Sequence, residues 1–325
     1  MRSFIILVAL TVLIAGCGFE PGELDCKSGR EGITARFVTG QFPTNIQQEV
    51  QTPILIEVEN RGAYTSKQVY VWLRYGKDFF ESNRDEIDIT GFPGKAQWNR
   101  CTPQVQRDQI TIEAFELPIA TTSFQRPLTL DICYHYTNNV STQVCVDPLP
   151  SSISALEPNC RPSERRISGG QGSPLGITKL DTPTFIKESG SDTSGKVRIG
   201  IHLENFGDGM ILAYEEPDIP IEACTFQEQT YQNHVFIKAF LDNHRLDCNL
   251  LTGPVEIENK VFLRYDPEVV ELDTGRMTIK NYFLLCETED TIDLSREVVM
   301  TFDANIEYYY RDTRADERTT TIRKI

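Results

Sequence analysis

The sequence lacks the short motifs that mark the common classes of enzyme. It contains no HExxH zinc motif, no GxSxG nucleophile motif and no phosphate-binding loop. The glycine-rich run at 169–172, GGQG, has neither the lysine nor the strand-to-helix setting of such a loop. The acidic runs at 85–88 and 287–293 lack the ligand order of an EF-hand. We therefore expect a protein that is not an enzyme, with no catalytic residue, no cofactor and no metal site.

Positive charge is also scarce. The chain has 32 lysines and arginines against 47 aspartates and glutamates, which gives a formal net charge of −15. Proteins that bind nucleic acid neutralise its phosphates with lysine and arginine, so this balance argues against a nucleic-acid partner. An acidic surface of this kind mainly keeps a protein soluble.

The one long apolar run lies at the N-terminus, and it is too short to cross a bilayer. After Arg2, the stretch 4–15 is apolar except for Thr11, whereas a spanning helix needs about 20 such residues. Its length fits the hydrophobic part of a secretory signal peptide. The run ends in Ile14-Ala15-Gly16-Cys17, which resembles a prokaryotic lipobox, where the cysteine sulfur receives a diacylglycerol.

This resemblance implies an exported lipoprotein that is anchored in the membrane at the cell surface. Residues 1–16 are then the signal peptide, Cys17 is the lipid attachment site and 17–30 form a tether. A lipid with two chains holds a protein firmly, since each buried methylene contributes about 0.8 kcal/mol. The alternative is an ordinary signal peptide with a cysteine that lies near the cleavage point by chance.

Cysteine pairs with CxxC spacing are absent, which argues against zinc ribbons and thioredoxin-type redox sites. Eight of the nine cysteines remain if Cys17 carries the lipid. An even number in an exported chain predicts disulfides. The eight are Cys26, Cys101, Cys133, Cys145, Cys160, Cys224, Cys248 and Cys286.

One disulfide follows from strand parity. The segment 128–147 is interpreted as a hairpin with its tip at Asn139, which places Cys133 and Cys145 opposite each other on the outward face. Asn139 also begins the one Asn-x-Ser/Thr sequence of the chain, and a hairpin tip tolerates a glycan.

A second predicted disulfide joins Cys248 and Cys286. The second half of the chain holds three cysteines, so one bridge must leave it if all are paired, and Cys160 is the natural outside partner. The remaining connectivity cannot be deduced from the sequence.

Alternation of apolar and polar residues dominates the chain. Ile54, Ile56 and Val58 share one strand face, and the segment 128–136 alternates in the same way. Such alternation predicts half-buried strands of antiparallel sheets. Only 231–244 also fits a helix. The fold class is therefore expected to be all-β.

The strand pattern occurs twice. The segment ILIEVENRG at 54–62 matches IGIHLENFG at 199–207, and LTLDICYHY at 128–136 matches FDANIEYYY at 302–310. The Asn-x-Gly in the first pair supplies residues that tolerate positive φ where a strand turns. Two matches in the same order predict two copies of one fold. The alternative is that unrelated β-strands share a generic alternation.

These observations predict two tandem Ig-like antiparallel β-sandwiches, at 31–149 and 176–325, joined by a Pro/Ser/Gly-rich linker at 150–175. The strand followed by Asn-x-Gly is similar to CARDB-like and other Ig-like repeats of prokaryotic surface proteins. The whole chain resembles two-domain surface lipoproteins of archaea. That resemblance implies extracellular scaffolding or adhesion, and it brings no catalytic residues.

The second copy is longer than the first by about 29 residues, because the early matches lie 145 positions apart and the late ones 174. We expect this insertion, around 210–290, to form the binding surface of a non-enzymatic surface protein that acts in adhesion or ligand display. An insertion with structural value alone is the other interpretation. An accessory structural subunit of a membrane or envelope complex is the alternative function. Whether the ligand is a surface protein or a glycan stays open.

Overall fold

The structure is a computed structural model, and its description covers most of the chain after residue 25. The described residues are 26–98, 101–118, 121–148, 159–168, 170–191, 193–212, 224, 234–249, 254–257, 260–264, 269–271, 277–279 and 281–324. The expected signal peptide and the lipid site Cys17 lie outside the described residues.

Strands make up nearly all of the regular structure, which confirms an all-β fold. In the first part of the chain these are β1 (Ile33–Phe37), β2 (Asn45–Gln47), β3 (Gln51–Asn60), β4 (Ser66–Arg74), β5 (Phe80–Ser82), β6 (Glu86–Phe92), the 3₁₀ helix η1 (Lys95–Trp98), β7 (Gln104–Ala114) and β8 (Ser123–Val146). They are followed by β9 (Arg165–Arg166), β10 (Leu175–Leu180), β11 (Thr184–Lys187), β12 (Ser194–Asn205) and β13 (Met210–Leu212). The last are β14 (His234–Leu241), β15 (His244–Asn249), β16 (Pro254–Ile257), β17 (Lys260–Arg264), β18 (Val269–Glu271), β19 (Met277–Ile279), β20 (Asn281–Thr288), β21 (Ile292–Asp293) and β22 (Val298–Arg323).

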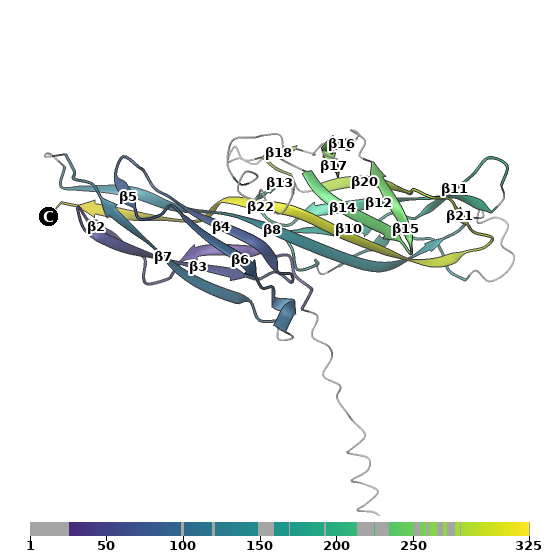
Figure 1. Cartoon of the computed structure of the whole chain (residues 1–325), viewed down its shortest axis with the longest axis horizontal. Coiled ribbons are helices and arrows are strands. Elements are labelled where there is room, and N and C mark those ends of the chain that lie inside the picture. The colour runs from purple at the N-terminus through teal and green to yellow at the C-terminus, as the bar shows by residue number, and fades with distance from the viewer. Residues whose placement is uncertain are drawn as a thin grey trace, which may run out of the picture.

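Two very long strands form the spine of the molecule (Figure 1). β8 has 24 residues and β22 has 26, and they pair antiparallel along almost their whole length, with one irregularity between Asp312 and Asp316. The hairpin predicted for 128–147 is therefore wrong, because β8 runs straight through Asn139. Asn139 lies opposite Asn305 of β22. Pairing with β22 therefore satisfies the backbone groups of this segment, which a hairpin would have satisfied within β8 itself.

The sheets form two lobes that share the two long strands. In the first lobe, a four-stranded sheet of order β1-β3-β7-β5 packs on β6-β4-β8. In the second lobe, the sheet continues from β22 through β14, β15, β20, β12 and β10 to β9. One continuous hydrophobic core, built from the inner faces of these strands, fills both lobes.

Strand pairing does not follow the predicted ranges 31–149 and 176–325. The end of β22, Asp316–Arg323, pairs with the start of β8 and also with β2, which both belong to the first lobe. The C-terminus therefore returns to the lobe in which the described chain begins. The pairing of β2 with β22 is parallel, whereas the other pairings between described strands are antiparallel.

The first Asn-x-Gly segment forms a turn that a tyrosine from the spine closes. Asn60 Nδ2 donates to the carbonyl oxygen of Tyr64, and the Gly62 nitrogen donates to Asn60 Oδ1, each at 3.1 Å. The Tyr64 nitrogen donates to the hydroxyl of Tyr136, again at 3.1 Å. A methyl group on Gly62 would lie 1.6 Å from that hydroxyl, so glycine is required there for the close approach.

The second Asn-x-Gly segment repeats this arrangement residue by residue. Asn205 Nδ2 donates to the carbonyl oxygen of Gly209 at 2.9 Å, and the Gly207 nitrogen donates to Asn205 Oδ1 at 3.1 Å. The Gly209 nitrogen donates to the hydroxyl of Tyr310 at 2.7 Å. The two Asn-x-Gly segments thus occupy equivalent places beside the aligned tyrosines, Tyr136 and Tyr310, of the spine.

The two copies face each other across the spine. Tyr134 pairs with Tyr310 and Tyr136 with Tyr308, although the repeat aligns Tyr134 with Tyr308 and Tyr136 with Tyr310. A pseudo-two-fold axis through the pair His135–Tyr309, at the centre of this register, therefore relates β8 to β22. The long strands are therefore equivalent elements that each serve both lobes.

Four disulfides join the eight cysteines of the described chain. The pair Cys248–Cys286 is as predicted. The predicted pair Cys133–Cys145 is wrong, since the two lie 12 residues apart on one straight strand, about 40 Å at the usual rise. The pairs observed are Cys26–Cys101, Cys133–Cys224 and Cys145–Cys160. The bridge that leaves the second half of the chain is therefore Cys133–Cys224, whereas Cys160 is bonded to Cys145.

Candidate functional site

The outer face of the spine is the candidate site. Inner-face side chains of β8 and β22 enter the core, and the alternate side chains point to the opposite side of the sheet. Part of the insertion reaches this opposite side, since Cys224 is bonded to Cys133, whereas β14 extends the sheet itself beside β22. The outer face divides into a covered part near the pseudo-two-fold axis and an open part in the second lobe.

The covered part is a small second core. Cys133 and Tyr309 from the spine, Tyr70 from β4, and Leu212 and Cys224 are all buried and pack together. Trp72 stacks on Tyr70 with the ring centroids 5.7 Å apart. Burial of two tyrosine rings on an outer sheet face requires a cover, and the Cys133–Cys224 disulfide fixes that cover in place.

A buried carboxylate lies beside this second core. Asp131 is fully buried and pairs with the Arg74 guanidinium. Burial raises the pKa of Asp131 to about 6, although the nearby charges of Arg74 and Arg311 favour its ionised form. Burial also lowers the pKa of Arg311 below its usual value.

These charges line a cleft of about 320 Å³, which Trp72, Tyr75, Asp85 and Cys224 also line. The Asp85 carboxylate accepts hydrogen bonds from Tyr75 and, at 3.1 Å, from Lys77 Nζ. The Tyr75 bond is the main reason that the pKa of Asp85 is lowered. Each carboxylate of the cleft therefore has a structural partner within the protein.

His135 lies on the outer face of β8 and is fully buried. Its Nε2 lies 3.8 Å from Glu307 Oε2, and Lys67 Nζ lies 3.7 Å from the same oxygen. Burial lowers the pKa of His135, whereas the neighbouring imidazole is the main cause of a lowered pKa at Glu307. The pair therefore favours a neutral imidazole beside an ionised carboxylate.

The open part of the outer face is a platform of six side chains from three adjacent strands, which we call the open platform. Two rows cross the sheet, because Lys238 lies opposite Asn305 and Phe240 opposite Asp303, while β8 continues both rows. The six are Lys238 and Phe240 on β14, Asp303 and Asn305 on β22, and Asn139 and Ser141 on β8.

The open platform borders a hollow of about 490 Å³, which Tyr64 and Gln171 help to line. Asn305 Nδ2 donates to Asn139 Oδ1 at 2.7 Å, so the two amides hold each other in orientation. The Tyr64 hydroxyl donates to the carbonyl oxygen of Asn139 at 3.2 Å. Asn139, which begins the Asn-x-Ser sequence, is thus exposed in the middle of a strand and not at a hairpin tip.

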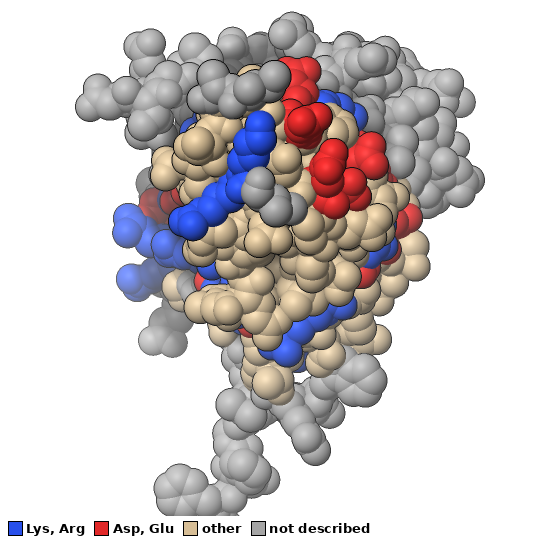
Figure 2. Space-filling model, turned by 90° about the vertical axis from the view of Figure 1, so that its left-hand side faces the viewer, with Lys and Arg blue, Asp and Glu red and all other residues tan. Residues whose placement is uncertain are grey.

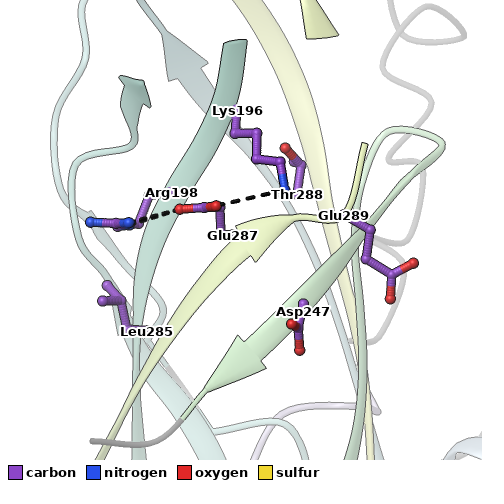
Figure 3. A pocket seen from close by; sticks show the side chains of 7 residues that line it. All are labelled: Lys196, Arg198, Asp247, Leu285, Glu287, Thr288 and Glu289. Carbon is purple, nitrogen blue, oxygen red and sulfur yellow. Dashed lines mark hydrogen bonds and ion pairs between the residues drawn. The ribbon is translucent and has the colours of Figure 1, made fainter. Parts of the chain in front are cut away.

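A third hollow, of about 410 Å³, lies over the strands that carry the Cys248–Cys286 bridge (Figure 3). Glu287 in its centre pairs with Arg198 at 2.8 Å and with Lys196 at 3.8 Å. Glu289 pairs with Arg245 at 3.2 Å, so most of these charges neutralise one another. We regard this hollow as a structural ion-pair network on an exposed sheet face.

In the described part of the chain, no helix has the length and apolar character needed to cross a bilayer. No group of three or more histidine, cysteine, aspartate or glutamate side chains in that part of the chain is arranged to hold a metal ion.

Sequence reasoning pointed to the insertion around 210–290, but it did not single out most residues of the open platform. The insertion around 210–290 contributes residues to all three hollows. Cys133 anchors the cover, and Cys248 and Cys286 join two strands of the inserted region. Phe240 was missed because 231–244 fits a helix or a strand equally well. The pairing of Phe240 with Asp303, 63 positions later in the chain, shows that the segment is a strand.

Comparison with known proteins assigns no family. No family model matches the chain, and no curated protein matches it. One similar solved structure is the serine-rich repeat adhesion glycoprotein Srr1 from Streptococcus agalactiae. It shares 7% sequence identity, the match covers 92% of this chain and 97% of that one, and the TM-score is 0.17. At that TM-score the likeness supports no conclusion about fold or function.

Proposed function

We propose that this protein is a non-enzymatic lipoprotein of the cell surface that acts by adhesion or ligand display. The four disulfides indicate that it folds in an oxidising environment outside the cytoplasm. A lipid on Cys17 holds it at the membrane, and the inserted region of the second half contacts the ligand. The tandem Ig-like character of the two copies, similar to CARDB-like repeats, belongs to the same proposal.

One observation carries the proposal. The inserted strand β14 adds Lys238 and Phe240 to an exposed face of the rigid spine, beside polar side chains of β8 and β22. Disulfides tie the inserted region at both Cys224 and Cys248. A binding face built on paired strands and fixed by covalent bridges loses little conformational entropy when a ligand binds.

Membrane attachment is tested by Cys17→Ser, compared with the wild-type chain after cell fractionation. We expect the variant to appear in the medium or to accumulate unprocessed. A Cys17→Ser protein that stays in the membrane at the mature size contradicts lipid attachment at this residue. Mature-size protein with an N-terminal lipid-modified cysteine in the wild type supports it.

An accessory structural subunit of a membrane or envelope complex is the second candidate, and one surface favours it. Figure 2 looks onto the end of the molecule that carries β2, β5 and the C-terminus, and the middle of that face is free of charged side chains. Val50 is 38% exposed and Phe115 40% exposed, and both lie where β3 begins and β7 ends. Exposed apolar side chains on an uncharged face are typical of protein interfaces.

Purification from detergent-solubilised membranes separates the two candidates. A protein that copurifies in fixed stoichiometry, and is lost with Phe115→Asp but kept with Phe240→Ala, favours the subunit. Adhesion through the inserted region predicts the reverse: loss of ligand with Phe240→Ala and no effect of Phe115→Asp.

A further inference from the structure

We infer that the open platform binds a neutral oligosaccharide, an inference that rests on the proposed binding function and names its ligand class. The argument starts from the two rows of side chains. In one row Lys238, Asn305 and Asn139 lie side by side on adjacent strands, and the other row is formed by the next outward residues of the same strands. All of these side chains project from paired strands, so their spacing is fixed by the sheet.

The polar groups of the platform suit hydroxyl groups. The bond from Asn305 to Asn139 uses one donor of the first amide and one acceptor of the second. The remaining amide groups then offer a donor and an acceptor to a ligand. Asp303 and Ser141 are exposed in the neighbouring row and add a carboxylate acceptor and a hydroxyl. Adjacent donors and acceptors of this kind match the paired hydroxyls of a sugar ring.

Phe240 provides the apolar part of the site. Its side chain is 37% exposed and it is the aromatic member of the platform, opposite Asp303 in the sheet. A pyranose ring has a face of C–H groups that packs on an aromatic ring, while its hydroxyls reach polar groups at the rim. An exposed aromatic ring next to polar side chains that are held in orientation offers both kinds of contact at once.

Size and charge argue for a neutral saccharide over other ligands. The hollow of about 490 Å³ lies within the ~300–1,000 Å³ of small-molecule sites. Lys27 and Lys238 line the hollow together with Asp303, while the chain as a whole carries a net charge of −15, so neither sign of charge dominates the site and a ligand without net charge fits it. A stable protein interface buries at least about 1,000 Å² in all, and the platform offers only one aromatic side chain as an anchor.

The test uses the full mature protein, purified from membranes in detergent, on an array of glycans. The array holds oligomannosides, maltooligosaccharides and galactosides beside sialylated and uronate-containing glycans. We expect binding to at least one neutral class, and the bound glycan is then titrated against the variants. Phe240→Ala should weaken binding at least tenfold, and Asn305→Ala should weaken it in the same direction. Phe240→Tyr, which keeps the ring face, should stay within twofold.

Phe115→Ala is the matched control, because Phe115 is exposed to a similar extent at the far end of the first lobe. Its affinity should equal that of the wild type. The saccharide assignment is overturned if the wild-type protein binds no neutral glycan or binds acidic glycans only. It is also overturned if the Phe240→Ala variant binds the glycan as tightly as the wild type does. If Phe240→Ala still abolishes retention on native envelope fragments, the binding function stands with a ligand of another class. If it changes neither readout, both proposals fail.

Discussion

The tyrosine-closed turns predict a strong coupling between Gly207 and Tyr310. A methyl group added at Gly207 would lie 1.9 Å from the Tyr310 hydroxyl and 2.9 Å from its ring carbon Cζ. Gly207→Ala therefore forces an overlap that the turn must relieve by moving. Tyr310→Phe removes the nearest clashing atom and leaves Cζ as the closest neighbour, which a small shift accommodates.

The magnitudes follow from the contacts. Overpacking by one methyl group costs about 1–3 kcal/mol, and we expect Gly207→Ala at the upper end. Tyr310→Phe leaves the buried Gly209 nitrogen without its 2.7 Å hydrogen bond, which costs about 1–3 kcal/mol. The double variant keeps the second loss but escapes much of the first. Its free energy of unfolding should therefore exceed the additive value by about 1–2 kcal/mol.

Guanidinium chloride unfolding of the four proteins, with disulfides intact, measures this coupling. The matched control combines Gly207→Ala with Tyr136→Phe, the equivalent tyrosine of the other turn, whose hydroxyl contacts Tyr64 and Gly172 instead. That pair should be additive to within about 0.5 kcal/mol. Additivity for Gly207 with Tyr310 as well would refute the packing that we assign to the turn.

Further predictions concern charge and covalent links. Asp131 has a folded pKa of about 6 against an ordinary value of 3.8, so the folded state binds the proton more tightly and stability falls as pH rises through this window, by up to about 3 kcal/mol. Asp131→Asn should flatten the fall in unfolding free energy between pH 4 and 7. Asp85→Asn should have the opposite effect, because the pKa of Asp85 is lowered and its charge stabilises the fold as pH rises. An unchanged pH profile in Asp131→Asn contradicts the burial of the Asp131 charge. Replacing Cys133 and Cys224 by serine opens a loop of 91 residues, and loop entropy predicts a loss of about 4–5 kcal/mol. The Cys145–Cys160 bridge spans 15 residues and should contribute about 3 kcal/mol, so chemical denaturation that gives the reverse order argues against the entropic account.

Local sequence patterns predicted the repeat, the strand faces and one disulfide. They succeeded where a short segment carries its own constraint, as in the Asn60 and Asn205 turns, whose side chains bond to atoms two and four residues away. They failed at Asn138 and Asn139, which favour a turn by local propensity. Asn138 is instead buried and donates to Gln171 and Leu175, and β22 supplies the partner ladder from more than 160 residues away.

The same reason explains the errors in the cysteine pairs and in the site. A hairpin would have placed Cys133 beside Cys145, so one wrong turn produced one wrong bridge. The parity assignment itself was sound, since both cysteines lie on the same face of β8. The open platform depends on three strands that are distant in sequence, and no short window of the sequence contains two of these strands. Long-range pairing, which sequence alternation does not encode, decided both cases.

Photo-crosslinking on intact cells tests the central claim most directly. The full-length protein is produced with p-benzoylphenylalanine at position 240, and a second protein carries it at position 115 as the control. The account predicts that irradiation links position 240 to an extracellular ligand, and that position 115 gives no product. Crosslinks from position 115 with none from position 240 would contradict a binding face on the inserted region and would instead place the interface at the end of the first lobe.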